Sequence, residues 1–241
     1  MPRFTSRLID RFGVAEGTMA FAFERPAGFA FTAGQFVTIT LPNPLYTDEK
    51  GNRRIFSIAS APQEDGRLVV ATRMTGSAFK RTLAEVALGA EVTLFGPGGS
   101  FTLGPDSSTP VAFIAGGIGI TPFRSMILDA VSRNLLQPIT LVYSNRNPEG
   151  AAFHAELAHI AETYSSLTYV PTMTQAETSK QLWDGERRLV SAEFLRDHIG
   201  DMAAPTFYLV GPPGMVTAVT KTVLEAGADP AHVRAEEFKG Y

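Results

Sequence analysis

The fold is decided by the stretch Ala115-Gly116-Gly117-Ile118-Gly119-Ile120-Thr121-Pro122, which follows the apolar run 111–115. The pattern predicts a strand, a glycine-rich turn and a helix whose first turn holds Pro122. Glycines let the backbone approach a ligand closely, and the free amides of a helix N-terminus attract an anion such as a nucleotide pyrophosphate. Pro122 stands where the G-x-G-x-x-G fingerprint has its third glycine. A tight strand-to-helix turn without a ligand would look the same.

Toward the C-terminus, strand and helix patterns alternate. Strands are expected at 111–115, 139–143, 167–173, 207–210 and 233–238, and helices at 122–132, 151–163, 191–198 and 213–226. Such alternation predicts a five-stranded parallel sheet with helices on both faces.

Toward the N-terminus, short runs with period-two alternation predominate. Strands are expected at 19–23, 35–40, 56–59, 67–71 and 91–95, with a helix near 78–86. This pattern is typical of a small antiparallel barrel or sandwich. The turn-rich segment 104–110 then separates two predicted domains, 1–103 and 111–241.

Composition excludes several classes of site. Among the 241 residues there is no cysteine, so this chain cannot hold a disulfide, a thiolate-ligated iron–sulfur cluster or a cysteine-based zinc site. Two of its four histidines, His154 and His159, are five positions apart on a predicted helix, and we expect no metal site.

Charge and hydropathy set further limits. The net charge of −3 argues against a nucleic-acid-binding protein. No apolar run is long enough to span a membrane, and the first residues lack the apolar core of a secretion signal, so we expect a cytoplasmic protein. Residues 1–103 carry 11 Lys and Arg against 9 Asp and Glu, whereas the remainder carries 10 against 15. The mild positive excess suits an acidic partner, or is ordinary solvated surface.

Two segments of the N-terminal half carry groups that suit a ligand with phosphates and a planar ring. The first is Arg53-Arg54-Ile55-Phe56-Ser57-Ile58-Ala59-Ser60. A guanidinium clamps phosphate oxygens, an aromatic ring packs on a planar ring, and a hydroxyl bonds a ring nitrogen. The second is Gly76-Ser77-Ala78-Phe79-Lys80, which opens the helix with exposed amides. An edge strand with solvated arginines and an ordinary serine-capped helix are the alternatives.

Two more segments lie near the C-terminus. Tyr208-Leu209-Val210-Gly211-Pro212-Pro213-Gly214-Met215 ends a strand and starts a helix at the sheet edge where ligands collect, unless it is only a proline-rich connector. The chain ends in Glu236-Glu237-Phe238-Lys239-Gly240-Tyr241, with two aromatic residues.

Taken in order, these segments resemble the ferredoxin–NADP reductase family of flavoproteins. The matching positions are Arg54, Phe56 and Ser57, the Gly76-Ser77 helix start, Gly96-Pro97-x-Gly99-x-Phe101, Gly116 to Pro122, Gly211-Pro212-Pro213-Gly214-Met215, and Glu236 with Phe238. Each motif is weak to moderate, and the ordered set is highly specific. The resemblance implies a Greek-key β-barrel that binds FAD, followed by an α/β domain that binds NADPH or NADH.

The resemblance also assigns roles. Arg54 would hold the FAD pyrophosphate, Phe56 would pack along the flavin, and Ser57 would hydrogen-bond near flavin N5. The same cofactor site would include Ile58, Gly76, Ser77 and Ala78. The nucleotide would be cradled by Gly116, Gly117, Gly119, Thr121, Gly211, Pro212 and Met215. Phe238 would stack over the flavin, with Tyr241 near FAD and Glu236 beside the nicotinamide; Ser57, Glu236 and Phe238 are thus the expected catalytic residues.

This sequence departs from the family pattern at two positions. Family members usually have tyrosine at Phe56, so a hydroxyl contact to the flavin side chain would be lost. Many have cysteine at Val210, and hydride transfer is expected to survive its absence.

Arginines near the predicted nucleotide site bear on the choice between NADPH and NADH. Arg146, at the tip of the strand 139–143, would meet a 2′-phosphate together with Arg187 or Arg188, or these arginines are simply solvated.

The resemblance implies hydride transfer between NAD(P)H and FAD, with electrons passed to a separate ferredoxin, flavodoxin or oxygenase component. Two alternatives remain: a flavin-binding electron-transfer subunit of a larger enzyme, and a general reductase of quinones, ferric chelates or free flavins.

Overall fold

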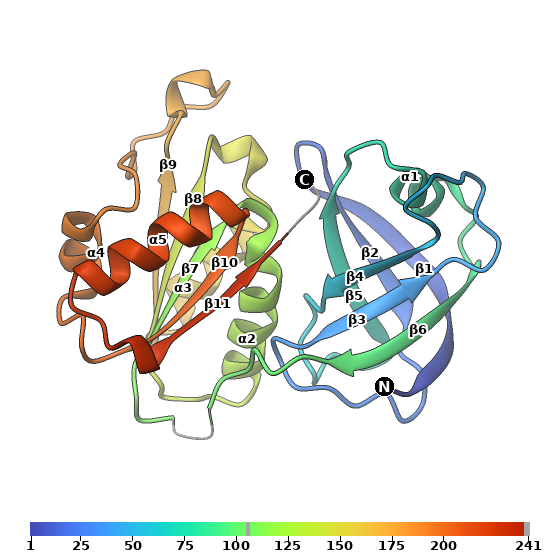
Figure 1. Cartoon of the computed structure of the whole chain (residues 1–241), viewed down its shortest axis with the longest axis horizontal. Coiled ribbons are helices and arrows are strands. Elements are labelled where there is room, and N and C mark those ends of the chain that lie inside the picture. The colour runs from blue at the N-terminus through green and yellow to red at the C-terminus, as the bar shows by residue number, and fades with distance from the viewer. Residues whose placement is uncertain (105–106, 239–241) are drawn as a thin grey trace. The chain divides into compact units, whose positions relative to one another are not determined.

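The computed structural model describes residues 1–104 and 107–238, which form two compact units (Figure 1). The first unit contains residues 1–103 and 121–132, and the second contains the rest of the described chain. Residues 121–132 follow the segment 104–110 in sequence but group with the first unit.

The first unit is built on a six-stranded antiparallel sheet in the order β4-β3-β6-β1-β2-β5. Its strands are β1 (Arg3–Ala15), β2 (Thr18–Glu24), β3 (Phe36–Thr40), β4 (Arg53–Ser57), β5 (Arg67–Arg73) and β6 (Glu91–Gly98). Beyond β4 the backbone N–H of Ala59 donates to the carbonyl of Val69 on β5 at 2.8 Å, which brings the two edges of the sheet together as in a barrel. Among the segments that connect these six strands, one forms an α-helix: α1 (Ala78–Glu85), between β5 and β6.

Strand β1 was not predicted, and its sequence explains why. Only Ser6 and Leu8 are buried along its 13 residues, so the apolar half of the alternation is too sparse to mark a strand. Backbone pairing with β2 on one side and β6 on the other holds it in the sheet.

Aromatic and aliphatic side chains of the inward faces fill the barrel. Phe21, Phe23, Val37, Ile39 and Leu94 are all fully buried in this core. Helix α2 (Ile120–Ser132) packs with the same unit: Arg124 Nη1 donates to the Ala59 carbonyl at 2.6 Å, and Ser125 Oγ donates to the Ser60 carbonyl at 2.7 Å.

The second unit is built on a five-stranded parallel sheet in the order β11-β10-β7-β8-β9. Its elements are β7 (Val111–Gly116), β8 (Ile139–Asn145), α3 (His154–Thr163), β9 (Leu167–Met173), α4 (Ala192–Ile199), β10 (Thr206–Gly211), α5 (Pro213–Glu225) and β11 (Val233–Glu237). Helices α4 and α5 lie in front of the sheet in Figure 1, over a core that includes Ile114, Phe194 and Leu209.

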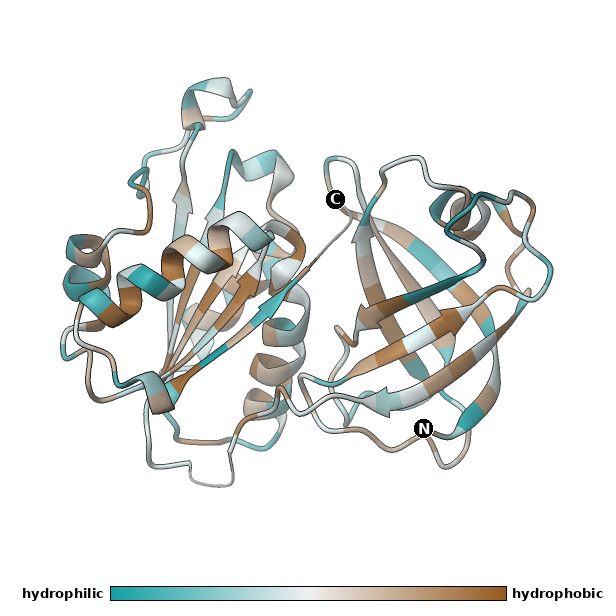
Figure 2. Cartoon of the chain, viewed as in Figure 1, coloured by the Kyte–Doolittle hydropathy of each residue, from teal (hydrophilic) through white to brown (hydrophobic). Residues whose placement is uncertain are grey.

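Hydropathy follows this arrangement. The central strands β7 and β10 are almost continuously apolar, as expected for strands covered on both faces, whereas the edge strand β11 is largely hydrophilic (Figure 2). The predicted fold class, an antiparallel barrel with a parallel five-stranded α/β unit, is confirmed. None of the helices in the described ranges has both the length and the apolar character needed to cross a membrane.

Candidate functional site

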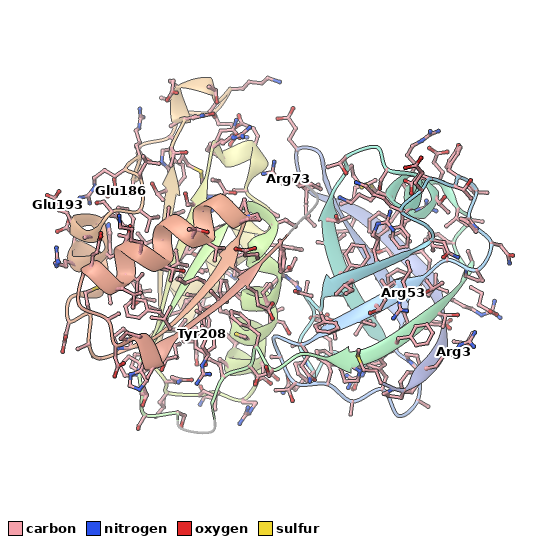
Figure 3. The ribbon with its side chains drawn as sticks, viewed as in Figure 1. Arg3, Arg53, Arg73, Glu186, Glu193 and Tyr208 are labelled. Carbon is pink, nitrogen blue, oxygen red and sulfur yellow. The ribbon has the colours of Figure 1, made fainter. Side chains whose placement is uncertain are left out.

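The two arginines that begin β4 point in opposite directions. Arg53 is exposed and lies over the ring of Phe95, 4.9 Å from its centroid; Arg3 lies over the same ring at 5.8 Å (Figure 3). Arg54 faces the other way, with its guanidinium 5.4 Å from the centroid of Phe79 on α1. Because successive side chains of a strand point to opposite faces of the sheet, Arg53 lies on the surface and Arg54 lies beside α1.

Arg54 is partly engaged by the loop that precedes it. Its Nη1 donates to the carbonyls of Lys50 at 2.8 Å and Gly51 at 3.0 Å. Its Nη2 is buried and makes no hydrogen bond in the described part of the chain, and lies 3.6 Å from Asp48 Oδ1. A buried guanidinium nitrogen without an acceptor is a costly arrangement that a phosphate oxygen would relieve. The residues present therefore fit a diphosphate such as that of FAD.

The N-terminus of α1 adds further donors beside Arg54. Ser77 is the N-cap residue, and its Oγ accepts from Lys80 N at 3.4 Å. The next amide, Ala78 N, donates to Asp48 Oδ2 at 3.0 Å. Gly76 has φ +73°, a backbone conformation that favours glycine. Burial lowers the pKa of Lys80, and the nearby charges of Arg54 and Lys50 lower it further. The site is thus a concentration of positive charge.

Three other barrel residues expected at the flavin differ in their burial and hydrogen bonding. Phe56 is only 9% exposed and packs in the barrel core, with its ring 5.8 Å from that of Phe79. Ile58 is fully buried. Ser57 is largely buried, and its Oγ makes no hydrogen bond to residues of the described ranges, so the hydroxyl is available. Flavin contacts by Phe56, Ser57 and Ile58 remain predictions.

In the second unit, the glycine-rich turn is shaped by close packing. Gly117–Gly119 form a 3-10 turn between β7 and α2. A Cβ on Gly119 would lie 2.4 Å from the Val210 carbonyl oxygen, and one on Gly116 would lie 2.1 Å from Met215 Sδ. Gly119 requires glycine because the turn after β7 lies directly against the backbone of the turn after β10, whereas at Gly116 the Met215 side chain could move aside. Thr121 follows in the first turn of α2 and is buried.

The turn after β10 also receives the C-terminal segment. Pro212 precedes α5, whose first residue is Pro213. The backbone N–H of Phe238 donates to the Gly211 carbonyl at 2.9 Å, which places Phe238 beside this turn. Burial raises the pKa of Glu236 above its usual range. The structure thus brings Gly116, Gly119, Gly211, Met215 and Phe238 together; Tyr241 lies outside the described residues.

At the C-terminal end of β8, Arg146 is exposed and its side chain has no partner among residues 1–104 and 107–238. Arg188 is instead occupied, because its guanidinium contacts Glu186 at 2.6 Å and Asp197 at 2.7 Å. Arg187 donates to the Trp183 carbonyl. Of the three arginines, Arg146 is the one whose guanidinium makes no hydrogen bond or ion pair within the described ranges, and a role in nucleotide binding remains a prediction.

Sequence reasoning missed two residues at these sites. Asp48 lies on a loop before β4 and reaches Arg54 and α1 only in the folded chain. Asn145 is 6% exposed at the end of β8, and neither polar atom of its side chain has a partner within the described chain. Its position at the carboxyl edge of a parallel sheet was a usable signal, since ligands collect there. The described ranges hold no cluster of three or more potential metal ligands.

Comparisons with known proteins agree with this geometry. The sequence model of the oxidoreductase NAD-binding domain matches residues 113–221. Ferredoxin–NADP reductase B of Sorangium cellulosum is 31% identical over 98% of this chain and 97% of its own length. The phenol 2-monooxygenase reductase component DmpP of a Pseudomonas species is 29% identical over 97% of this chain, which spans only 64% of that protein.

Solved structures show the same fold. A ferredoxin–NADP+ reductase from Neisseria gonorrhoeae, determined with bound FAD and NADP, has a TM-score of 0.79 at 22% identity, covering 98% of both chains. The cytochrome b5 reductase domain of Ulva prolifera nitrate reductase has a TM-score of 0.83 at 16% identity, covering 98% of this chain and 97% of that one. The chain therefore belongs to the ferredoxin–NADP reductase family and is an FAD-dependent NAD(P)H oxidoreductase.

Proposed function

We propose that the chain oxidises NADPH, holds FAD at the Arg54 site of the barrel, and delivers electrons to a separate redox protein. In this assignment residues 1–103 bind FAD and residues 111–241 bind the nucleotide. The observation that carries the proposal is the buried, unbonded Nη2 of Arg54 beside the first amides of α1. These groups suit a diphosphate, which the FAD of a family member carries.

Bound FAD would supply the chemistry of hydride transfer from the nicotinamide and of electron release to the acceptor. The chain's own residues would bind the flavin and the nicotinamide and orient them toward each other. Ser57 offers an unengaged hydroxyl in a largely buried position, suited to a hydrogen bond with a flavin ring nitrogen. Phe238, fixed to Gly211 by its backbone, supplies an aromatic ring at the end of β11. Glu236, whose pKa is raised by burial, offers a carboxyl that holds a proton more readily than a solvated one.

The preference for NADPH rests on Arg146. Its guanidinium is exposed at the carboxyl end of β8, and no carboxylate in the described ranges pairs with it. A planar guanidinium binds a 2′-phosphate strongly and gains nothing comparable from the hydroxyl of NADH. The name of the Sorangium relative, a ferredoxin–NADP reductase, agrees with this choice.

A separate acceptor is supported by composition and by relatives. With no cysteine, this chain supplies no thiolate for an iron–sulfur cluster. The curated relatives include a ferredoxin reductase and reductase components of oxygenases. We also propose a cytoplasmic location, where a nicotinamide nucleotide is available as the electron donor.

The test is a comparison of acceptors with the purified, FAD-loaded chain. NADPH oxidation is followed with ferredoxin, flavodoxin and a ferric chelate, each at several concentrations. The proposal predicts the highest kcat/KM with one of the two proteins. Equal or faster turnover with ferric chelate, quinone or free flavin would favour a general reductase. FAD binding without any NAD(P)H oxidation would indicate an electron-transfer subunit of a larger enzyme.

A further inference from the structure

The anion site around Arg54 already contains one carboxylate, that of Asp48. Asp48 Oδ2 accepts from the backbone N–H of Ala78 at 3.0 Å, and Oδ1 lies 3.6 Å from Arg54 Nη2. Oδ1 also accepts from the backbone N–H of Lys50 at 2.9 Å. Asp48 therefore contacts both groups that the proposed function assigns to the flavin diphosphate, the Arg54 guanidinium and the first turn of α1.

The loop that carries Asp48 is fastened to the same helix. The backbone N–H of Tyr46 donates to Thr82 Oγ1 at 3.0 Å, and the Tyr46 hydroxyl donates to Glu85 at 2.5 Å. The Arg81 guanidinium lies 3.9 Å from the centroid of the Tyr46 ring. Tyr46 thus fixes the loop to α1 two residues before Asp48.

The Asp48 carboxylate lies at a site with three positive charges, those of Arg54, Lys80 and Lys50. The charges of Arg54 and Lys50 are close enough to Lys80 to lower its pKa. Asp48 is the carboxylate that contacts Arg54 among the described residues. The Asp48 carboxylate occupies one donor of the α1 N-terminus and faces the guanidinium as a phosphate would, but it leaves Arg54 Nη2 without a hydrogen bond within the described chain.

We propose that Asp48 is a positioning residue that stands in for the flavin diphosphate in the flavin-free chain and must leave Arg54 and Ala78 for FAD to bind. This inference rests on the proposed FAD site at Arg54. It adds that the chain regulates its own cofactor affinity, because only molecules with Asp48 displaced are competent to bind. The apparent affinity is then the intrinsic affinity reduced by the competent fraction.

The experiment measures FAD binding to the full chain after its flavin has been removed, by stopped-flow quenching of flavin fluorescence. The variant Asp48→Asn keeps the size of the side chain but loses the charge that faces Arg54. The association rate constant is expected to rise about tenfold, as if the competent fraction grew from about a tenth to nearly all. The dissociation rate constant should stay within about twofold, since Asp48 is displaced in the complex.

The matched control is Glu49→Gln, which removes the same charge one residue away. Glu49 is exposed, and its side chain has no partner in the described ranges. The two variants are compared at about 0.1 M and about 1 M salt, where the Debye length falls from about 10 Å to about 3 Å. A general effect of net charge would appear in both variants and fade in high salt. Displacement of a direct contact predicts that only Asp48→Asn binds faster, and that it does so at both salt concentrations.

Two results would overturn the inference while the proposed function stands: equal association rates for Asp48→Asn and Glu49→Gln, or weaker FAD binding by Asp48→Asn than by the unmodified chain. The second would make Asp48 a support of the site rather than a competitor. If neither the unmodified chain nor either variant bound FAD, the proposed function would fail, and this inference with it.

Discussion

The two proposed phosphate sites of this chain, at the start of α1 and at the turn after β7, are built in opposite ways. The barrel site consists of long charged side chains around the N-terminus of α1, and a carboxylate of the chain already contacts them. The site of the α/β unit consists of glycines pressed against a neighbouring turn, with 2.4 Å between a Cβ built on Gly119 and the Val210 oxygen. A site made of side chains can exchange one anion for another, whereas a site made of packed backbone tolerates almost no change of shape.

The largest expected effect is on the packed turn. Gly119→Ala would place a methyl group against the backbone of Val210, which has no free end to move aside. We expect the free energy of unfolding to fall by about 3 kcal/mol, as in severe overpacking. Gly214→Ala is the matched control, because a Cβ there meets no heavy atom within 4 Å. Urea unfolding followed by circular dichroism measures both, and equal stabilities would refute the packing argument.

The next effect separates the two arginines of β4. Arg54→Ala should weaken FAD binding about 100-fold, equivalent to about 2.7 kcal/mol, because a charge-assisted contact to the diphosphate is lost. Arg53→Ala removes an equal charge from the opposite face, beside Phe95, and should change the affinity less than about twofold. Titration with FAD, followed by fluorescence, provides both values. Similar losses in the two variants would mean that only overall charge matters.

A smaller effect concerns the nucleotide. Arg146→Ala should lower the ratio of kcat/KM for NADPH to that for NADH about tenfold, because the 2′-phosphate loses its guanidinium. Arg188→Ala should leave this ratio unchanged, since Arg188 is held by Glu186 and Asp197. Steady-state rates with the two nucleotides measure the ratio. A drop with Arg188→Ala alone would transfer the role to Arg188.

The smallest effect depends on pH. Because burial raises the pKa of Glu236 in the folded chain, its ionisation disfavours folding. This cost begins as pH rises past the unfolded value of about 4.3 and is complete above the folded pKa. Glu236→Gln should therefore be more stable than the unmodified chain at pH 7 by about 0.5 kcal/mol, a modest value because the group is partly solvated. Thermal unfolding at pH 4 and pH 7 tests the sign, and a less stable glutamine variant at pH 7 would reverse it.

Much of the α/β unit was predictable because its strands are continuous apolar runs between helices. The expected range 167–173 coincides with β9, and the other strands differ by only a few residues at their ends. Helix α3 begins at His154 rather than at 151, because Phe153 adopts a left-handed conformation with φ 60°. The sequence around Phe153 contains no pattern from which this left-handed backbone conformation could be predicted.

The barrel unit was harder to predict, because its strands pair residues far apart in sequence. Strand β1 has few buried apolar residues and is held by backbone pairing with β2 and β6. Asp48 illustrates the same difficulty at the site: it contacts Ala78, 30 residues away. Motifs identified Arg54 and Ser77 by their residue types, but a contact between a loop and a helix start depends on the folded backbone.

The central claim, that FAD on this chain is reduced by a nicotinamide nucleotide, is tested most directly by an anaerobic titration. The FAD-loaded chain is mixed with NADPH in steps while the flavin absorbance is recorded. The account predicts that the yellow colour bleaches as NADPH is added, and that the Arg54→Ala variant retains too little FAD to show the change. A chain that binds FAD and stays yellow with both NADPH and NADH would contradict it.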